Sequence, residues 1–454
     1  MTPTRKSLWL ALLTAIIMML ASGCNDTLRQ FITPVPGPSG DPGALSHAIV
    51  LSTNPAVPTD GTVAVGSDLH IDVSGDTVAG VVPVGPNPVF LGKTTNRVFV
   101  LNGDGTVSSY IALLPQSSAP TTITLPTGTV AQGGGFSNSG NFYVADVSGD
   151  VNMISTSITA VTQTLTAGTN PVMVAGNNAN NKVYVLNEGS DDVTVISTID
   201  NFVFPNTIST LDPVNHNGES AHPIWGVMAP DGVHVFIVNQ GDGTHNGWVS
   251  VIDTLLDVVI ANIDVGVSPN YAVFEPTNQR LYVSNTGSPF ISVIKANGID
   301  LANRIVPTKI ADIPIPAPAT SVAALQDGSR AYAAIGGCPA GTNHTNIVAN
   351  LPSCSGNQVA VIDVQALALK KMITVGPGAV SIDAAANSSR VYVIAANVKD
   401  PASGAPAANV SIIKTADDSV LGTVPIPQQS LGCQNPKACP QNATQIPFMV
   451  RVRP

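Results

Sequence analysis

The fold is decided by a stretch of three short pieces, Gly168-Thr169-Asn170-Pro171-Val172-Met173-Val174, Lys182-Val183-Tyr184-Val185-Leu186-Asn187 and Asp192-Val193-Thr194-Val195-Ile196. Each piece alternates apolar and polar residues and is bounded by Gly, Asn, Asp or Pro, so each is predicted to form a short, half-buried strand. The unit recurs, and its central aromatic position is occupied seven times: Phe99, Phe142 or Tyr143, Tyr184, Phe236, Tyr282, Tyr332 and Tyr392. With Tyr143 as the second member, these positions lie 41 to 60 residues apart, a period typical of propeller blades.

This repeat predicts an all-β, seven-bladed β-propeller of four-stranded antiparallel blades. We expect residues 46–454 to form a single propeller domain, with repeats at about 85–427 and a C-terminal tail at 428–454. Residues 46–84 contain strand signals but no complete repeat, so we expect them to close the ring by pairing with the last blade, which begins near Gly376. Closure would remove exposed sheet edges, which otherwise favour aggregation.

Three phrases resemble the YVTN (YncE-like) β-propeller family: Arg390-Val391-Tyr392-Val393, Val249-Ser250-Val251-Ile252-Asp253-Thr254 and Arg280-Leu281-Tyr282-Val283-Ser284-Asn285. The resemblance covers roughly residues 80–427 and implies the propeller fold. It does not imply one activity, because this superfamily includes binding proteins, lactonase-like enzymes and redox enzymes on the same scaffold.

The N-terminus resembles an export signal followed by a bacterial lipobox. Arg5 and Lys6 precede the apolar run Leu8–Leu20, and small residues lead to Cys24. We therefore expect residues 1–23 to be a lipoprotein signal peptide and Cys24 to carry the lipid that anchors the protein to a membrane. Residues 24–45 are rich in Pro and Gly and are expected to form a tether. The expected location is a bacterial cell envelope, on the periplasmic side of the inner or outer membrane or at the cell surface.

Cysteine content and charge limit the remaining possibilities. The four cysteines after Cys24 are Cys338, Cys354, Cys433 and Cys439. In an exported protein they most simply form two disulfides, and although three pairings are open, proximity favours Cys338–Cys354 and Cys433–Cys439. Charged residues make up only 11% of the chain, and the formal net charge is −10. This argues against nucleic acid as a partner, because such binding needs a basic surface. We expect a monomer.

Long insertions between the expected strands gather on one face of the ring, which we call the loop-rich face. In each blade, four strands a to d run from the centre outward, so the b–c links and the d-to-a links lie on the same face. Four insertions fall on these links: 206–224, 239–248, 336–358 and 397–408. Only 296–309 lengthens a c–d link on the opposite face. Function is commonly built on long loops over a rigid scaffold, so we expect the working surface on the loop-rich face.

Polar residues in these insertions are candidates for a metal site. His216, His222 and His245 fall in neighbouring insertions, with Glu219 and Asp242 beside them, and the predicted ligands are the three histidines and Glu219. Neutral imidazoles and carboxylates suit Zn²⁺, Cu²⁺ or Mn²⁺. The alternative is that they are solvated or structural residues, since none shows the compact spacing of a helical metal motif. No cofactor is therefore predicted, and a divalent metal stays an open alternative.

A second group is a candidate for ligand contacts at the mouth of the central channel. Asn87, Asn170 and His222 each precede the proline that starts an inner strand. Trp225 and Trp248 border the insertions and would either stack on a ligand or pack in the core. His344 lies between Cys338 and Cys354; it is expected to face water, and a ligand contact is the alternative.

The preferred functional hypothesis is a non-enzymatic, lipid-anchored envelope propeller that binds an unknown protein or small-molecule ligand on the loop-rich face, with no catalytic residues. The first alternative is a periplasmic metal-dependent enzyme, either a lactonase-like hydrolase or an oxidoreductase, with its site at the channel mouth. The second alternative is a surface adhesion or scaffold protein. The enzyme alternative requires converging metal ligands, and the scaffold alternative requires binding patches on the outer strands.

Overall fold

The computed structural model describes residues 46–54, 64–94, 96–112, 119–296, 306–426 and 445–452. Cys24, Cys433, Cys439 and the expected signal peptide and tether lie outside these ranges. No helix in the described part of the chain is both long enough and apolar enough to span a membrane.

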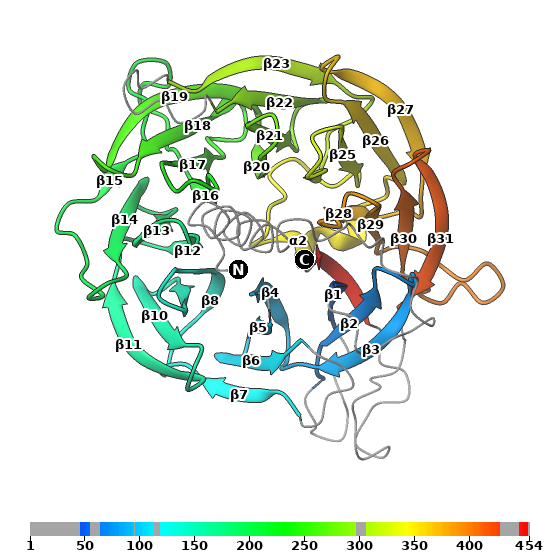
Figure 1. Ribbon diagram of the computed structural model, residues 1–454, viewed down its shortest axis with the longest axis horizontal. Coiled ribbons are helices and arrows are strands. Elements are labelled where there is room, and N and C mark those ends of the chain that lie inside the picture. Colours follow the sequence, from blue (N-terminus) through cyan, green and yellow to red (C-terminus); the bar gives the residue numbers. More distant parts are fainter. Residues whose placement is uncertain are drawn as a thin grey trace, which may run out of the picture.

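The strands form eight four-stranded antiparallel sheets arranged as the blades of a ring (Figure 1). The prediction of an all-β propeller with four-stranded antiparallel blades is confirmed, but the predicted number of seven blades is wrong. In Figure 1 strands such as β4, β20 and β28 lie towards the centre, whereas β3, β7 and β11 lie on the rim.

The blades are numbered here in chain order, with their strands given from the centre outward. Blades 1 to 3 are β4 (Pro88–Lys93), β5 (Arg97–Asn102), β6 (Thr106–Ile111) and β7 (Thr121–Thr124); β8 (Ala131–Phe136), β9 (Asn141–Asp146), β10 (Asp150–Ser155) and β11 (Ala160–Thr166); and β12 (Pro171–Ala175), β13 (Lys182–Asn187), β14 (Asp192–Ser197) and β15 (Ile208–Ser209). Blades 4 and 5 are β16 (Pro223–Met228), β17 (His234–Asn239), β18 (Asn246–Asp253) and β19 (Val258–Val267); and β20 (Pro269–Glu275), β21 (Arg280–Asn285), β22 (Phe290–Lys295) and β23 (Thr308–Pro314). Blades 6 to 8 are β24 (Ser321–Ala324), β25 (Arg330–Ile335), β26 (Gln358–Asp363) and β27 (Ala368–Thr374); β28 (Ala379–Ala384), β29 (Arg390–Ala395), β30 (Asn409–Lys414) and β31 (Ser419–Pro425); and β32 (Ile446–Val452), β1 (His47–Thr53), β2 (Ser67–Asp72) and β3 (Thr77–Pro83).

The eighth blade corrects the predicted mode of closure. Residues 46–84 do not complete the blade that begins near Gly376, because that blade already has its own four strands, β28–β31. Instead β1, β2 and β3 form a blade whose inner strand is β32, from the C-terminal tail. The sequence repeat missed this blade for two reasons. Its inner strand is separated from the other three by almost the whole chain, and β1 carries Ile49 and Val50 where other blades have an aromatic residue.

The core consists of apolar layers between neighbouring blades. The recurring aromatic residue of the second strand is fully buried in seven blades: Phe99, Tyr143, Tyr184, Phe236, Tyr282, Tyr332 and Tyr392. In these seven blades a flat ring in the middle of the blade fills the wedge between adjacent sheets, which explains why the position recurs at the blade period.

Three neighbouring pairs of blades are also joined by a polar clasp. In each clasp, a Tyr hydroxyl from strand b of one blade donates a hydrogen bond to an Asp in the c–d turn of the next blade. The three pairs are Tyr184 with Asp257, Tyr332 with Asp418 and Tyr392 with Asp76. Each Asp has a left-handed φ between 53° and 54°, a conformation that Asp and Asn adopt more readily than most residues. A basic residue two positions before the Tyr forms an ion pair with the same Asp.

Asp418 is the most buried of the three clasp aspartates, and its side chain is 1% exposed. It binds Tyr332 Oη at 2.6 Å, Lys370 Nζ at 2.7 Å and Arg330 Nε at 3.1 Å. We predict that Asp418→Asn lowers the free energy of unfolding by about 3 kcal/mol, because two cations lose their buried counter-charge. Asn keeps the left-handed turn and an acceptor for Tyr332. Chemical denaturation measures the change. The neighbouring Asp417→Asn is the control, since Asp417 is exposed, and an equal effect of both changes would contradict the clasp.

Candidate functional site

The four long links expected on the loop-rich face do lie on one face of the ring. The antiparallel register places Asn187, at the end of strand b, opposite Pro171, at the start of strand a, and it places Ser209, at the end of strand d, opposite Asp192. The links β15–β16, β17–β18, β25–β26 and β29–β30 therefore share this face, whereas β22–β23 lies on the other.

The longest of these links, β25–β26, closes the central channel, and we call residues 338–354 the plug. A disulfide joins Cys338 to Cys354 at its base. Between the two cysteines, the chain forms the short helix α2 (Ile347–Asn350) and the 3₁₀ turn η1 (Leu351–Ser353). Figure 1 shows α2 near the centre of the ring. Ile347, Leu351 and Cys354 are buried in the main apolar core. The insertion 336–358 was expected only to lie on the loop-rich face, and it also folds into the channel.

Hydrogen bonds to several blades hold the plug in place. Gln240 of blade 4 donates to Gly341 O at 3.3 Å and accepts from Asn343 Nδ2 at 3.2 Å. Thr286 Oγ1 of blade 5 accepts from Gly341 N at 3.0 Å. Asn397 of blade 7 donates to two plug carbonyls, those of Leu351 and Cys354. The plug is therefore bound to both sides of the ring.

His344 occupies the inner end of the plug and does not face water as expected. Its Nε2 donates to Val172 O of blade 3 at 3.1 Å, and its ring makes edge contacts with Phe90 and Trp225. Burial lowers the pKa of His344 to about 4, with a further contribution from the charge of Arg451. The imidazole is therefore neutral at physiological pH.

Beneath the plug, a small cavity of about 50 Å³ remains in the channel. Arg451 of β32 extends into this region, and its guanidinium lies 5.7 Å from the ring centre of Trp225 and 5.5 Å from that of Tyr271. Trp225 is buried, and its Nε1 donates to Ala272 O at 3.1 Å. Trp225 thus lines the channel as part of a packed cation–π group, and the plug covers it.

A larger hollow of about 300 Å³ lies beside the plug on the loop-rich face. It is lined by Glu188, His222, Gln240, Gly241, Asp242, Gly243, Ser268 and Gly341. These residues come from links of blades 3, 4 and 5 and from the plug itself. Burial raises the pKa of Glu188, although the nearby His222 and a 2.9 Å hydrogen bond from Asn170 act in the opposite direction. The hollow thus contains a carboxyl group that is partly withdrawn from water.

The three residues expected at the channel mouth share a backbone requirement with Ser268, which also precedes the proline of an inner strand. Asn87, Asn170, His222 and Ser268 have φ values of 45° to 52°, in the left-handed region that few residue types adopt easily. Three of them also contribute to the hollow: His222 and Ser268 line it, and Asn170 holds Glu188. Asn87 is exposed on blade 1 and is not among the residues that line the hollow.

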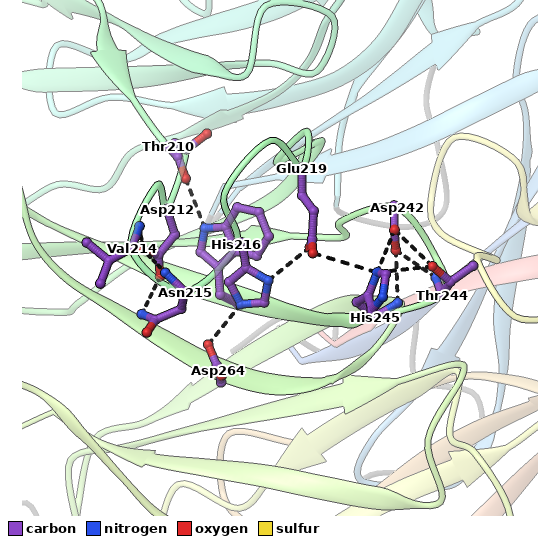
Figure 2. A network of polar contacts seen from close by, with 11 residues as sticks. Thr210, Asp212, Val214, Asn215, His216, Glu219, Asp242, Thr244, His245 and Asp264 are labelled. Atoms are coloured by element: carbon purple, nitrogen blue, oxygen red, sulfur yellow. Dashed lines mark hydrogen bonds and ion pairs between the residues drawn. The ribbon is translucent and has the colours of Figure 1, made fainter.

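A polar network extends outward from the hollow (Figure 2). His216 is buried, and its ring stacks on Trp248 at 4.4 Å between centres. Its Nδ1 lies 3.0 Å from Glu219 Oε2, and its Nε2 lies 3.0 Å from Asp264 Oδ1. Burial opposes the charged form, but the hydrogen bonds to Asp264 and Glu219 outweigh it and raise the pKa of His216. Trp248 is fully buried and donates to Thr210 O at 2.9 Å.

Glu219 connects this buried pair to an exposed histidine. Figure 2 shows Glu219 between His216 and His245, and its Oε1 lies 3.6 Å from His245 Nδ1. The same nitrogen lies 2.7 Å from Asp242 Oδ2. The hydrogen bond to Asp242 raises the pKa of His245.

Two sets of described residues bring three potential ligand atoms within 4.8 Å of one another: Asp212, His216 and Asp264, and Glu219, Asp242 and His245. The structure therefore brings together His216, Glu219 and His245 from the predicted metal group. His222 belongs to neither set. Asp242, which the sequence placed beside these histidines, also joins the network. Asp264 joins it although it was not among the candidates, and no sequence spacing distinguishes it from other carboxylates.

The structure also contains a buried chain of polar contacts between blades 8 and 1 that the sequence did not predict. His70 Nε2 lies 2.8 Å from Tyr110 Oη, and Tyr110 donates to Asp68 Oδ2 at 2.8 Å. Burial raises the pKa of Asp68 to about 7, despite this hydrogen bond. The pairing of the N-terminal strands with the rest of the ring places these residues, and this pairing was not predicted.

Neither a protein-family model nor a curated protein sequence matches this chain. Solved structures do match it. Hydrazine synthase from Kuenenia stuttgartiensis is 15% identical, with a TM-score of 0.51 over 73% of this chain and 96% of that one. Dihydro-heme d1 dehydrogenase NirN, solved in complex with DHE, is 12% identical, with a TM-score of 0.61 over 92% of this chain and 76% of that one. The propeller domain of Cps50 (Swd1) from Myceliophteria thermophila is 9% identical, with a TM-score of 0.50 over 72% and 95%. At these identities the likeness establishes the β-propeller fold alone.

The plug predicts a pH dependence. Because the pKa of His344 falls from 6.5 to about 4 in the fold, its contribution to stability is complete above pH 6.5 and is lost as the pH falls towards 4. The loss amounts to about 3 kcal/mol. His344→Gln keeps a donor for Val172 O but does not titrate. Denaturation between pH 4 and pH 7.5 should therefore show a weaker acid dependence in the variant than in the unaltered protein. Parallel curves for the two proteins would contradict this assignment.

Proposed function

We propose that this protein is a lipid-anchored propeller of a bacterial cell envelope that binds a small polar ligand in the hollow beside the plug. One observation carries the proposal. The disulfide-bonded plug fills the central channel and leaves the 300 Å³ hollow as the larger of the two recesses described above. A volume of this size is at the lower end of the range for small-molecule sites.

The lining of the hollow supports recognition by hydrogen bonds. Glu188 and Asp242 offer carboxylate acceptors, Gln240 offers an amide, and His222 offers an imidazole. Trp225 and Trp248, the two candidates for stacking on a ligand, are buried beneath the loops. The ligand is therefore expected to be hydrophilic, and Glu188 is its most informative contact, because burial has already removed part of the water around this carboxyl.

The proposed location rests on the sequence together with one covalent bond. Residues 1–24 have the pattern of a bacterial lipoprotein signal ending at Cys24. The Cys338–Cys354 disulfide fits an oxidising compartment outside the cytoplasm. The resemblance to YVTN propellers is compatible with this assignment. The enzyme and scaffold alternatives stay predictions, and the solved neighbours include proteins whose names denote enzymes.

The proposal is tested with panels of four ligand classes: neutral sugars, amino acids, organic acids and amines. We expect one class to raise the melting temperature of the purified protein saturably, because a ligand that binds the folded state stabilises it by mass action. Glu188→Gln should weaken that binding about tenfold or more, as expected for loss of a charge-assisted hydrogen bond. Asp104→Asn is the matched control, because Asp104 is an exposed acid in the b–c link of blade 1. The absence of any saturable shift, or equal effects of the two variants, would refute the hollow as the site.

The disulfide provides a separate test of the plug. We predict that Cys338→Ser/Cys354→Ser leaves the ring folded but lowers the free energy of opening the plug by about 3 kcal/mol, because the opened loop is no longer restricted by a cross-link of this length. The 16-residue separation between the cysteines is the relevant loop. Native-state proteolysis should cut within the plug faster in the variant, since cleavage follows local opening. Unchanged cleavage together with unchanged ligand binding would show that the disulfide does not hold the plug.

A further inference from the structure

The geometry points to a site for one first-row divalent transition ion, such as Zn²⁺, formed by Glu219, Asp242 and His245. One ligand atom from each residue lies within 4.8 Å of the other two. His245 Nδ1 lies 2.7 Å from Asp242 Oδ2 and 3.6 Å from Glu219 Oε1. An imidazole nitrogen with two carboxylate oxygens is the donor set of many transition-ion sites, which commonly keep further positions for water or a ligand.

The tight turn after β17 holds two of these ligands in place. Asp242 Oδ1 accepts hydrogen bonds from the backbone N–H groups of Thr244 at 2.8 Å and His245 at 2.9 Å. These bonds orient the carboxylate so that Oδ2 faces the imidazole of the same turn. Asp242 and His245 are therefore preset to approach the same point.

The third ligand, Glu219, is positioned by a hydrogen bond from His216. Glu219 Oε2 binds His216 Nδ1 at 3.0 Å, which leaves Oε1 directed towards His245. His216 is itself fixed by stacking on Trp248 and by Asp264 at 3.0 Å. Because both of its ring nitrogens are engaged, His216 is a positioning residue rather than a ligand. Outer partners of this kind orient the ligands of many metal sites.

Charge favours a dication at this position. Two carboxylates meet here, those of Glu219 and Asp242, whereas Asp264 lies on the other side of His216 (Figure 2). Within the described ranges, their ion-pair partners are only His216 and His245, and no Lys or Arg neutralises them. A bound cation would supply the missing positive charge, and the imidazole selects a transition ion over Ca²⁺ or Mg²⁺, which prefer oxygen ligands alone.

The second set of converging groups carries no site of its own. Asp212 caps a turn through the backbone N–H groups of Val214 and Asn215. His216 is already bound on both sides, and Asp264 is one of its two partners. This second group instead fixes His216, which in turn holds Glu219, a ligand of the proposed site.

The ion would also bear on the ligand of the hollow. Asp242 belongs both to the metal set and to the lining of the hollow. An ion held at Asp242 would therefore lie at the wall of the hollow, where a carboxylate or hydroxyl of a small ligand completes its coordination. This last step rests on the proposed function, whereas the metal site itself does not.

The test is a titration of the full-length protein, purified in detergent and stripped with EDTA, with ZnCl₂, CoCl₂ and CaCl₂. Calorimetry should give one Zn²⁺ per chain, with weaker or undetectable binding of Ca²⁺. His245→Ala and Asp242→Asn should each weaken Zn²⁺ binding at least tenfold. The control is His234→Ala, at the start of β17 on the opposite face, which should leave binding unchanged. Both ligand residues are exposed, so melting temperatures close to that of the unaltered protein will show that the variants fold.

The Co²⁺ absorption spectrum separates the ligands from the positioning residue. His245→Ala should change the spectrum, because a nitrogen ligand is lost. His216→Gln should weaken binding severalfold while preserving the spectral shape, because Gln can still donate to Glu219. No saturable Zn²⁺ heat, Zn²⁺ binding unaffected in both ligand variants, or Ca²⁺ bound as tightly as Zn²⁺ would overturn the site. Repeating the ligand panels in EDTA distinguishes the two proposals, because a panel response without metal leaves the hollow intact even if the ion is absent.

Discussion

The antiparallel pairing of β1 with β32 is the contact on which the rest of the ring depends. It joins residues near the two ends of the chain, so it closes a loop of almost the full sequence, at an entropic cost of about 5 kcal/mol. Burial and strand pairing offset this entropic cost, because every residue of β1 is buried and β1 pairs on one side with β2 and on the other with β32. Without this contact, blades 1 and 7 would each lose a neighbour and expose an apolar layer.

Closure of the ring creates a central channel that would be the natural place for a ligand, but the plug occupies this channel. A disulfide-bonded insertion occupies the channel from the loop-rich face and places His344, Trp225 and Arg451 in a packed group. The accessible recess is moved off the axis, between the plug and the links of blades 3 to 5. At this recess Glu188 is held by the left-handed Asn170, His222 itself has a left-handed backbone, and turn hydrogen bonds position Asp242. The surface is therefore polar but not loosely built.

Local pattern carried most of the fold prediction. Alternation in stretches such as Lys182–Asn187 predicted strands, and the spacing of buried aromatics predicted blades, because both properties arise within a few residues. The eighth blade escaped because its pairing is between β1 and β32, which no local pattern reports. Residues 46–84 had to be assigned without knowledge of their partner.

For the candidate site, the sequence indicated which residues belong together but not what each of them does. Topology alone placed the insertions of blades 3 and 4 on one face, so His216, Glu219 and His245 could be grouped before any contact was known. Their individual roles could not. The stacking of His216 on Trp248 and the turn around Asp242 depend on side-chain packing. The position of His344 depends on how a non-repeating insertion folds back into the channel, and no periodic signal describes such a segment.

The clasps between blades have a consequence for how such a ring grows. Each blade of a clasped pair contributes a different half: a Tyr with a basic partner on strand b, or an Asp in its c–d turn. Blade 7 carries both halves, since Asp418 receives Tyr332 from blade 6 and Tyr392 reaches Asp76 in blade 8. A duplicated copy of this unit would bring an Asp that accepts from the Tyr of the preceding blade and a Tyr that donates to the Asp of the following blade. Gene duplication can thus add a blade whose junctions on both sides are already encoded, which makes the clasp a means of enlarging the ring one unit at a time.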